Sequence, residues 1–149
     1  MCKVIMTDKP ELASNFCNNV GLSLGITEPI IENLVHSFYI KVREDELIAP
    51  IFDNVIEGSW DEHLSRMCDF WSSIVLSTGR YKGQPLLKHI NIPNLHKEHF
   101  LRWLSIFEEN AYNTCSKEIA DFFIDRARKI AQSLMLGIKF YNKELKIRN

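Results

Sequence analysis

The sequence predicts an all-α protein with one hydrophobic core, and three observations support that class. Large apolar residues recur at spacings of three and four along several segments, which places them on one face of a helix. No segment shows the strict alternation or the Asn-Gly and Asp-Gly turns that are typical of a β-hairpin. The chain has 149 residues, a length typical of one domain that folds without disulfides.

Charge and cysteine content exclude several classes of function. The 18 lysine and arginine residues nearly balance the 19 acidic residues, so no overall charge attracts nucleic acid or an anionic membrane. Cys2, Cys17, Cys68 and Cys115 lie far apart, which argues against a disulfide framework or a zinc ribbon and indicates a reducing compartment. No apolar run reaches the ~18 residues of a membrane span, and the amino terminus lacks a signal-peptide core. We therefore expect a cytoplasmic protein.

Residues 1–26 carry the weakest pattern and are expected to form an N-terminal extension to a main domain of residues 27–149. Within the extension, residues 7–10 suit the start of a short helix and Gly21 suits its end. The main domain opens with Thr27-Glu28-Pro29, which is typical of a helix start. One apolar stripe follows at helical spacing: Ile31, Leu34, Val35, Phe38, Tyr39 and Val42. Because Tyr39 lies in this stripe, its hydroxyl requires a polar partner in the interior.

A second helix is marked at its start by a capping box. Ser59 supplies the cap and Glu62 lies three residues on, so the helix is expected to run from there to about Ser77. The preceding segment, Pro50-Ile51-Phe52, is interpreted as an irregular connection with Phe52 as an apolar plug. The inward stripe of the helix is His63, Met67, Phe70, Trp71 and Ile74. Its polar first member, His63, either lies at the wet rim of the core or guards a pocket.

A short element between two prolines carries a single histidine. Pro85 and Pro93 leave room for a turn or two of helix that holds His89. The next segment places Phe100, Trp103, Leu104 and Phe107 on one helical face with almost no charge. Such a stripe is usually protein core, and such a histidine is usually a hydrogen-bonded structural residue. The alternative is a planar cofactor on the aromatic wall with His89 as the ligand of its metal, as in haem proteins.

The last helix is expected to begin at the cap-type residues 113–116 and to run for more than five turns. Its inward residues are Ile119, Phe122, Phe123, Ala127, Ile130, Leu134 and Ile138. From Lys139 onward the chain is interpreted as a helix end followed by a solvated tail. His96 and His99 can share a helix face, but no third ligand lies at a zinc-like spacing, so zinc is disfavoured.

One ordered set of residues resembles the group III truncated haemoglobins, a branch of the globin family. The set spans about residues 28–137 and comprises Phe38-Tyr39, Phe52, His63, Phe70-Trp71, Tyr81, Gly83-Gln84-Pro85-Leu86, His89 and Trp103. The glycine-pair motifs of the other truncated groups are missing, as they generally are in group III. The resemblance implies a shortened globin in which two antiparallel helix pairs form a two-over-two sandwich around a haem. It says nothing about residues 1–26.

The resemblance also implies roles for individual residues. His89 would be the proximal iron ligand, Tyr39 and Trp103 the distal hydrogen-bonding residues, and His63 the residue at the distal-histidine position. From the residues themselves, we expect a backbone carbonyl of the 85–93 element to orient the His89 ring. Tyr81 and Lys88 are candidates for the propionate rim, and Lys88 equally suits a solvated surface position. The expected apolar walls for haem b (iron protoporphyrin IX) are Phe52, Met67, Phe70, Trp71, Ile92, Phe100 and Phe107.

Three functional hypotheses remain open from the sequence. By the resemblance, the first is a monomeric haem protein that binds oxygen, nitric oxide and carbon monoxide at a pentacoordinate iron and holds oxygen tightly in a polar distal pocket, for storage or transport. The second is a haem enzyme that oxidises nitric oxide or activates peroxide, with a reductase to restore the iron. The third is a haem-free helical interaction domain. Polar distal donors favour chemistry on bound oxygen over simple release.

Overall fold

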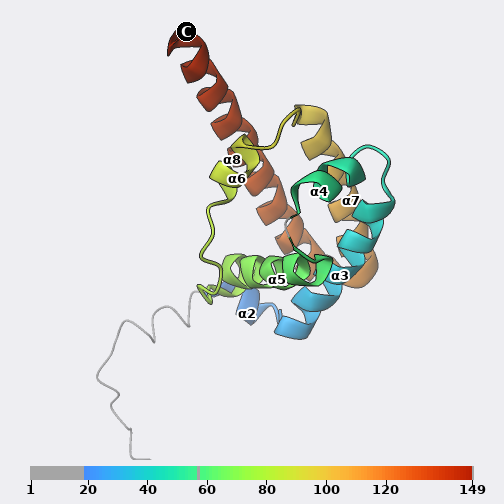
Figure 1. Cartoon of the computed structure of the whole chain (residues 1–149). Coiled ribbons are helices and arrows are strands. Elements are labelled where there is room, and N and C mark those ends of the chain that lie inside the picture. Colours follow the sequence, from blue (N-terminus) through green and yellow to red (C-terminus); the bar gives the residue numbers. More distant parts are fainter. Residues whose placement is uncertain (1–18, 57, 149) are drawn as a thin grey trace, which may run out of the picture.

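Residues 19–56 and 58–148 are described by a computed structural model, and every regular element among them is a helix (Figure 1). The all-α prediction is confirmed. No helix in these residues has both the length and the apolar composition that crossing a membrane requires. In chain order the helices are α2 (Val20–Ser23), α3 (Glu28–Glu44), α4 (Ala49–Val55), α5 (Trp60–Leu76), α6 (Pro85–Ile90), α7 (Lys97–Thr114) and α8 (Lys117–Arg148).

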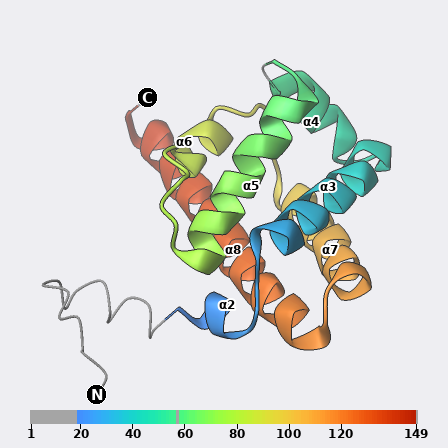
Figure 2. The same cartoon turned by 90° about the horizontal axis from the view of Figure 1, so that it is seen from below.

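Four long helices form two packed pairs. Helix α3 packs against α5, α7 packs against α8, and contacts between α3 and α7 join the two pairs (Figures 1 and 2). The three short helices pack against these long helices: α2 lies on α5, α4 contacts α3, and α6 lies on α8. The predicted two-over-two sandwich is therefore confirmed.

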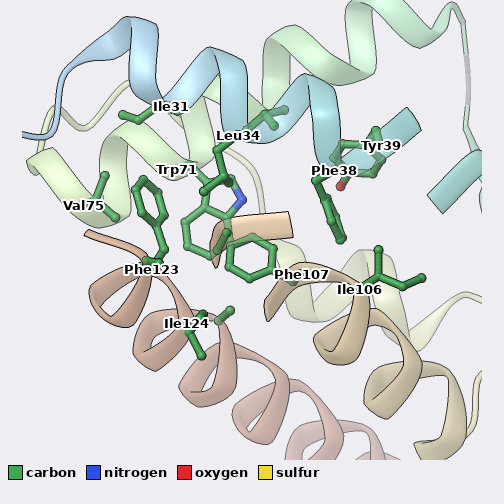
Figure 3. Packing of buried hydrophobic residues seen from close by; sticks show 14 of the residues in the cluster. Ile31, Leu34, Phe38, Tyr39, Trp71, Val75, Ile106, Phe107, Phe123 and Ile124 are labelled. Atoms are coloured by element: carbon green, nitrogen blue, oxygen red, sulfur yellow. The ribbon is translucent and has the colours of Figure 1, made fainter. Parts of the chain in front are cut away.

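The core lies where the two pairs meet, and aromatic rings fill its centre. The predicted stripe of α3 is buried throughout. Phe107 stacks on Trp71 with a ring-centroid distance of 5.0 Å and on Trp103 with a distance of 5.3 Å. Figure 3 shows Trp71, Phe107 and Phe123 gathered between helices of both pairs. Because full burial of one such side chain contributes roughly 1.5–3 kcal/mol, this aromatic group is a main source of the packing energy.

One buried polar side chain links the two helix pairs. Asn110 of α7 is 1% exposed, and its Nδ2 donates to the Leu34 carbonyl oxygen and to the Ser37 hydroxyl of α3, each at 3.1 Å. A hydrogen bond in the core requires a defined geometry, because a buried polar group left without a partner is costly. Asn110 therefore helps to set the register between α3, which carries Tyr39, and α7, which carries Trp103.

The predicted helix starts are largely correct because the signals are local. The Ser59 hydroxyl accepts the Glu62 N–H at 3.2 Å. Helix α5 ends at Leu76 and is followed by the cap residue Ser77, which adopts a left-handed conformation with φ of 57°. Thr27 precedes α3, whose first turn holds a proline. Pro85 begins α6, where its missing N–H costs nothing because a first-turn N–H has no intrahelical acceptor.

Three local expectations are wrong. The segment from Pro50 to Phe52 is not an irregular connection but part of helix α4, and Pro50 occupies its first turn. The segment after Lys139 is not a tail, because α8 continues as a helix to Arg148. Gly21 does not end a helix but lies within α2. The expected helix start at residues 7–10 lies outside the described residues.

Gly21 permits the close approach of α2 to α5. A Cβ atom at this position would collide with the backbone carbonyl oxygen of Val75, which cannot rotate away as a flexible side chain can. We therefore expect Gly21→Ala to lower the free energy of unfolding by about 1–3 kcal/mol, measured by urea unfolding. Leu22→Ala on the exposed side of the same helix is the control, with an expected change within about 0.5 kcal/mol. Similar losses in both variants would contradict the packing argument.

Candidate functional site

A cavity of about 640 Å³ lies beside the core, and each of the helices α3 to α8 contributes to its lining. This volume is within the range of roughly 300–1,000 Å³ that is typical of cofactor and ligand pockets. The cavity brings together side chains from positions 39 to 134 of the chain. Twelve of the thirteen sequence-predicted site residues line it: Tyr39, Phe52, His63, Met67, Phe70, Trp71, Tyr81, Lys88, His89, Ile92, Phe100 and Trp103.

Phe107 is the predicted wall residue that does not line the cavity. It is fully buried between the rings of Trp71 and Trp103, both of which do line it, so Phe107 lies one layer behind the wall. Helical periodicity places it on the same face as Trp103, but periodicity alone does not reveal where the cavity ends. Several apolar residues line the cavity although the sequence did not predict them there, namely Ile48, Ile51, Val55, Ile56, Leu95, Ile130, Ala131 and Leu134.

His89 is held in one orientation by its own helix. Its Nδ1–H donates to the Pro85 carbonyl oxygen one turn earlier, at 2.6 Å, so the expected backbone orientation of the ring is confirmed. This hydrogen bond leaves Nε2 as the ring nitrogen available to a metal. Burial lowers the pKa of His89, the Pro85 hydrogen bond opposes that shift, and the Lys88 charge adds to it. The imidazole is therefore neutral at physiological pH, which is the form that binds a metal.

His63 is enclosed by aromatic rings on the α5 side of the cavity. The rings of Tyr39, Trp60 and Phe52 lie 5.0, 5.7 and 6.2 Å from it between centroids. Its Nε2 is buried and has no hydrogen-bond partner among residues 19–56 and 58–148. The pKa of His63 is lowered to about 4, mainly by burial and in addition by the positive charges of Arg66 and Lys88. A neutral ring with an unpaired buried nitrogen in a cavity is suited to a bound ligand or water.

Tyr39 and Trp103 bring two hydrogen-bond donors to the same cavity. Tyr39 comes from α3 and is 5% exposed, and its burial raises the pKa of the phenol well above the ordinary value. The hydroxyl therefore remains protonated and can donate at physiological pH. Trp103 comes from α7, where its indole stacks on Phe107. Neither the Tyr39 hydroxyl nor the Trp103 indole N–H donates to another residue in the part of the chain that the structure describes. Both residues line the cavity, so both donors are available to a ligand.

Polar groups lie at the rim of the cavity. Tyr81 is held there because its backbone N–H donates to the Ser73 hydroxyl at 2.9 Å, and its ring packs edge-on against Phe70. Lys88 lines the cavity, and Arg66 does so as well. Arg66 was not predicted from the sequence, although it lies three residues after His63 and hence on a neighbouring turn of the same helix face.

His96 and His99, the pair considered for zinc, have a local structural role. His96 caps α7, its backbone N–H donates to the His99 Nδ1 at 2.8 Å, and its side chain accepts from the backbone of the third helical residue. This is a capping box made by two histidines. No cluster of three or more potential metal ligands occurs in residues 19–56 and 58–148.

The lining fits a haem. The walls are mostly apolar, one neutral histidine is oriented by a backbone carbonyl, and a second histidine has an unpaired buried nitrogen. Cationic side chains at the rim, Arg66 and Lys88, match the charge of two propionates. A haem buries its flat apolar surface against such walls and presents its carboxylates to the rim.

Comparison with known proteins identifies the family. No protein-family model matches the chain. The group 3 truncated hemoglobin ctb of Campylobacter jejuni is 38% identical over 109 residues, which cover 71% of this chain and 86% of the relative. The crystal structure of group III truncated hemoglobin from Campylobacter jejuni matches with a TM-score of 0.72 and 36% identity, over 76% of this chain and 91% of that chain. Fold and cavity are thus those of a haem-binding globin. The chain belongs to the group III truncated haemoglobins.

The lowered pKa of His63 predicts a pH dependence of stability. Because this pKa falls from 6.5 to about 4 on folding, the unfolded chain binds the proton more tightly. The contribution of neutral His63 is therefore fully present above about pH 6.5 and is lost as the pH falls toward 4. The free energy of unfolding is measured with urea at pH 7 and at pH 4.5. We expect its decrease between these two pH values to be about 1–2 kcal/mol smaller in His63→Gln than in the wild type, a value that allows for solvent screening. Exposed His36→Gln is the control, and equal pH profiles in wild type and His63→Gln would contradict the argument.

Proposed function

We propose that this globin binds haem b with His89 as the proximal ligand and with no second protein ligand to the iron. The observation that carries the proposal is the His89 ring, oriented by the Pro85 carbonyl and set in the wall of an apolar cavity. A single neutral imidazole is the proximal ligand in globins. The haem, when bound, would supply an iron able to bind a diatomic ligand such as oxygen, nitric oxide or carbon monoxide.

The distal side chains would stabilise and admit that ligand. Tyr39 and Trp103 donate hydrogen bonds to it, and both remain protonated over the physiological range because a buried phenol and an indole are weak acids. His63 lies beside Tyr39 with its neutral ring in the cavity. The apolar walls exclude water from the ligand, which strengthens each of these hydrogen bonds.

The rim residues would hold the propionates. Arg66 and Lys88 provide positive charge, and Tyr81 provides a hydroxyl whose position is set by the Ser73 hydrogen bond. An Arg–carboxylate contact adds orientation as well as energy, because the guanidinium donates two parallel hydrogen bonds. These contacts would fix the haem in one rotational setting.

The proposed role is tight oxygen binding that serves nitric oxide oxidation, in a cytoplasmic monomer. Two donors on the distal side favour retention of oxygen over delivery, because each strengthens the hold on the ligand. Oxidation of nitric oxide leaves ferric iron, so this role requires a reductase. The second candidate is oxygen storage or transport, which the mostly apolar lining of the cavity also supports.

An absorption spectrum of the purified protein tests the proposal. We expect a Soret band in the protein reconstituted with haem, and a shift of that band when the ferrous protein is exposed to carbon monoxide. The spectrum of the ferrous protein without ligand should be that of a five-coordinate haem. Absence of a Soret band after reconstitution would refute haem binding, and a six-coordinate ferrous spectrum would refute the free ligand position.

His63 is expected to control ligand entry. Its ring fills part of the cavity between Tyr39 and Trp60, so its removal opens space along the α5 side. We predict that His63→Ala raises the association rate of carbon monoxide by more than it changes the equilibrium affinity, as measured by flash photolysis. His36→Ala on the exposed face of α3 is the control. An unchanged association rate in His63→Ala would indicate a structural role only.

A further inference from the structure

The end of α8 projects beyond the helix pairs (Figure 1). Large apolar side chains on this part of the helix are exposed to solvent. We name residues 133–148 the C-terminal arm. Leu136, Phe140 and Ile147 of the arm are 65%, 65% and 74% exposed. Residues separated by four and by seven positions share one face of a helix, so these three side chains form one apolar stripe. Large apolar side chains grouped on one exposed helix face are typical of an interaction site.

Unpaired cations lie along one side of the apolar stripe and, at Lys143, within it. Lys139, Lys143 and Lys146 recur at spacings of four and three, and none forms an ion pair within residues 19–56 and 58–148. In the first half of α8, by contrast, Lys117 lies 2.7 Å from Asp121. The C-terminal arm therefore presents its positive charge outward, whereas earlier cations of the helix are neutralised by carboxylates of this chain.

The charge pattern selects among occupants of the stripe. The C-terminal arm holds four basic residues and one acidic residue, Glu144, so pairing with a second copy would bring like charges together. Lys143 lies between Phe140 and Ile147 on the same helix face, so the apolar face is narrow. Helices that lie in a membrane surface bury a broad apolar face, which argues against a membrane as the partner. A partner protein with acidic residues around an apolar centre would complement both the lysines and the narrow apolar stripe.

The C-terminal arm lies next to the helix that carries His89. Helix α6 packs on α8, and a Cβ atom on Gly137 would come within 2.6 Å of a methyl group of Leu86, so the two helices approach closely there. Leu86 and its neighbour Leu87 are themselves exposed, and His89 follows within one turn. Leu134, at the base of the arm, lines the cavity. A protein bound to this surface would therefore lie beside the haem site.

We propose that the C-terminal arm, with Leu86 and Leu87, is the docking surface for an acidic electron-donor protein that reduces the haem iron. The inference rests on the proposed function, because nitric oxide oxidation leaves iron that must be reduced. The donor protein loses one electron and the ferric iron gains it to become ferrous, and no covalent bond forms or breaks. The lysines attract the acidic face of the donor and speed its approach, and the apolar stripe supplies contact area.

Binding to a plant-type ferredoxin, an acidic one-electron carrier, tests the proposal. The haem-loaded protein is first checked by its Soret band and thermal unfolding. It is then titrated by calorimetry with oxidised ferredoxin at low ionic strength, so that no electron transfer contributes heat, and reduced ferredoxin is used for the kinetics. We expect the triple variant Lys139→Gln, Lys143→Gln, Lys146→Gln to bind roughly tenfold more weakly or worse, and the reduction of ferric iron in a stopped-flow instrument to slow by a similar factor. The charge-matched control is Lys117→Gln, Arg128→Gln, Lys129→Gln, in which the replaced cations are paired.

The apolar part of the surface has its own pair of variants. Phe140→Ser should weaken ferredoxin binding several-fold, whereas Ile40→Ser, an equally exposed apolar position on α3, should not. Equal losses of ferredoxin affinity in the test and control variants would overturn the docking proposal. So would the absence of ferredoxin binding by wild-type protein that shows a normal Soret band. Sedimentation with phosphatidylglycerol vesicles, or a concentration-dependent dimer abolished by Phe140→Ser, would overturn it in favour of a membrane or a second copy. A missing Soret band with intact ferredoxin binding would instead refute the proposed function.

Discussion

Replacement of His89 by alanine is expected to abolish stable haem retention. The imidazole supplies the proposed protein bond to iron, and its ring is pre-oriented by the Pro85 carbonyl at 2.6 Å, so its loss leaves only the apolar walls and the rim charges. Changes that merely disturb the orientation of a metal ligand cost about 10–100-fold in affinity, and removal of the ligand itself should cost more. The measurement is the rate of haem transfer to an excess of apomyoglobin, followed at the Soret band.

Two controls separate ligation from general destabilisation. His36→Ala on the exposed face of α3 and His96→Ala at the cap of α7 should leave the Soret band unchanged. Free imidazole added to His89→Ala should restore part of the spectrum, because it can occupy the space of the missing ring. Equal haem loss in all three variants, without rescue by imidazole, would point away from His89 as the single ligand.

Removal of either distal donor is expected to raise the oxygen dissociation rate by roughly tenfold or more. A buried hydrogen bond to a charged or strongly polarised acceptor contributes about 1.5–3 kcal/mol, and each ~1.4 kcal/mol is a factor of ten. Tyr39→Phe removes the phenol donor and Trp103→Phe removes the indole donor, while both retain an aromatic ring in the cavity wall. Stopped-flow displacement of oxygen by carbon monoxide measures the rate in each variant.

The control for these variants is a tyrosine that does not reach the cavity. Tyr112→Phe on α7 is suitable, because Tyr112 is exposed and its hydroxyl donates to Asp121 at 2.6 Å. Its dissociation rate should equal that of the wild type, which we expect to be slow. A fast wild-type rate that neither Tyr39→Phe nor Trp103→Phe changes would refute tight retention and restore oxygen transport as the first candidate.

The sequence alone was sufficient for the class of fold and for most helix positions. The apolar stripe of α3, the Ser59 cap of α5 and the proline at the start of α6 are signals that act within one or two turns, so they do not depend on the rest of the chain. Local signals also explain the errors. The sequence predicts an irregular connection at Pro50 to Phe52, although proline fits the first turn of a helix. It also predicts a solvated tail at the charged end of α8, which is helical.

The composition of the cavity was only partly predictable, because elements far apart in the chain form it. Periodicity identified the inward faces that hold Tyr39, His63 and Trp103, and the resemblance to a family selected His89. Periodicity did not reveal that Phe107 lies behind the wall, since the position of Trp71 and Trp103 around it depends on how α5 and α7 pack.

The sequence by itself determined the helices, the apolar faces and the short histidine-bearing element, because caps, prolines and the 3.6-residue period act locally. Only the tertiary structure decided which residues share the cavity, placed Arg66 at its rim, gave Asn110 its partners on α3 and left the end of α8 uncovered. Each of these depends on the packing of helices distant in sequence, and the free energy of that packing is distributed over contacts that no single segment contains.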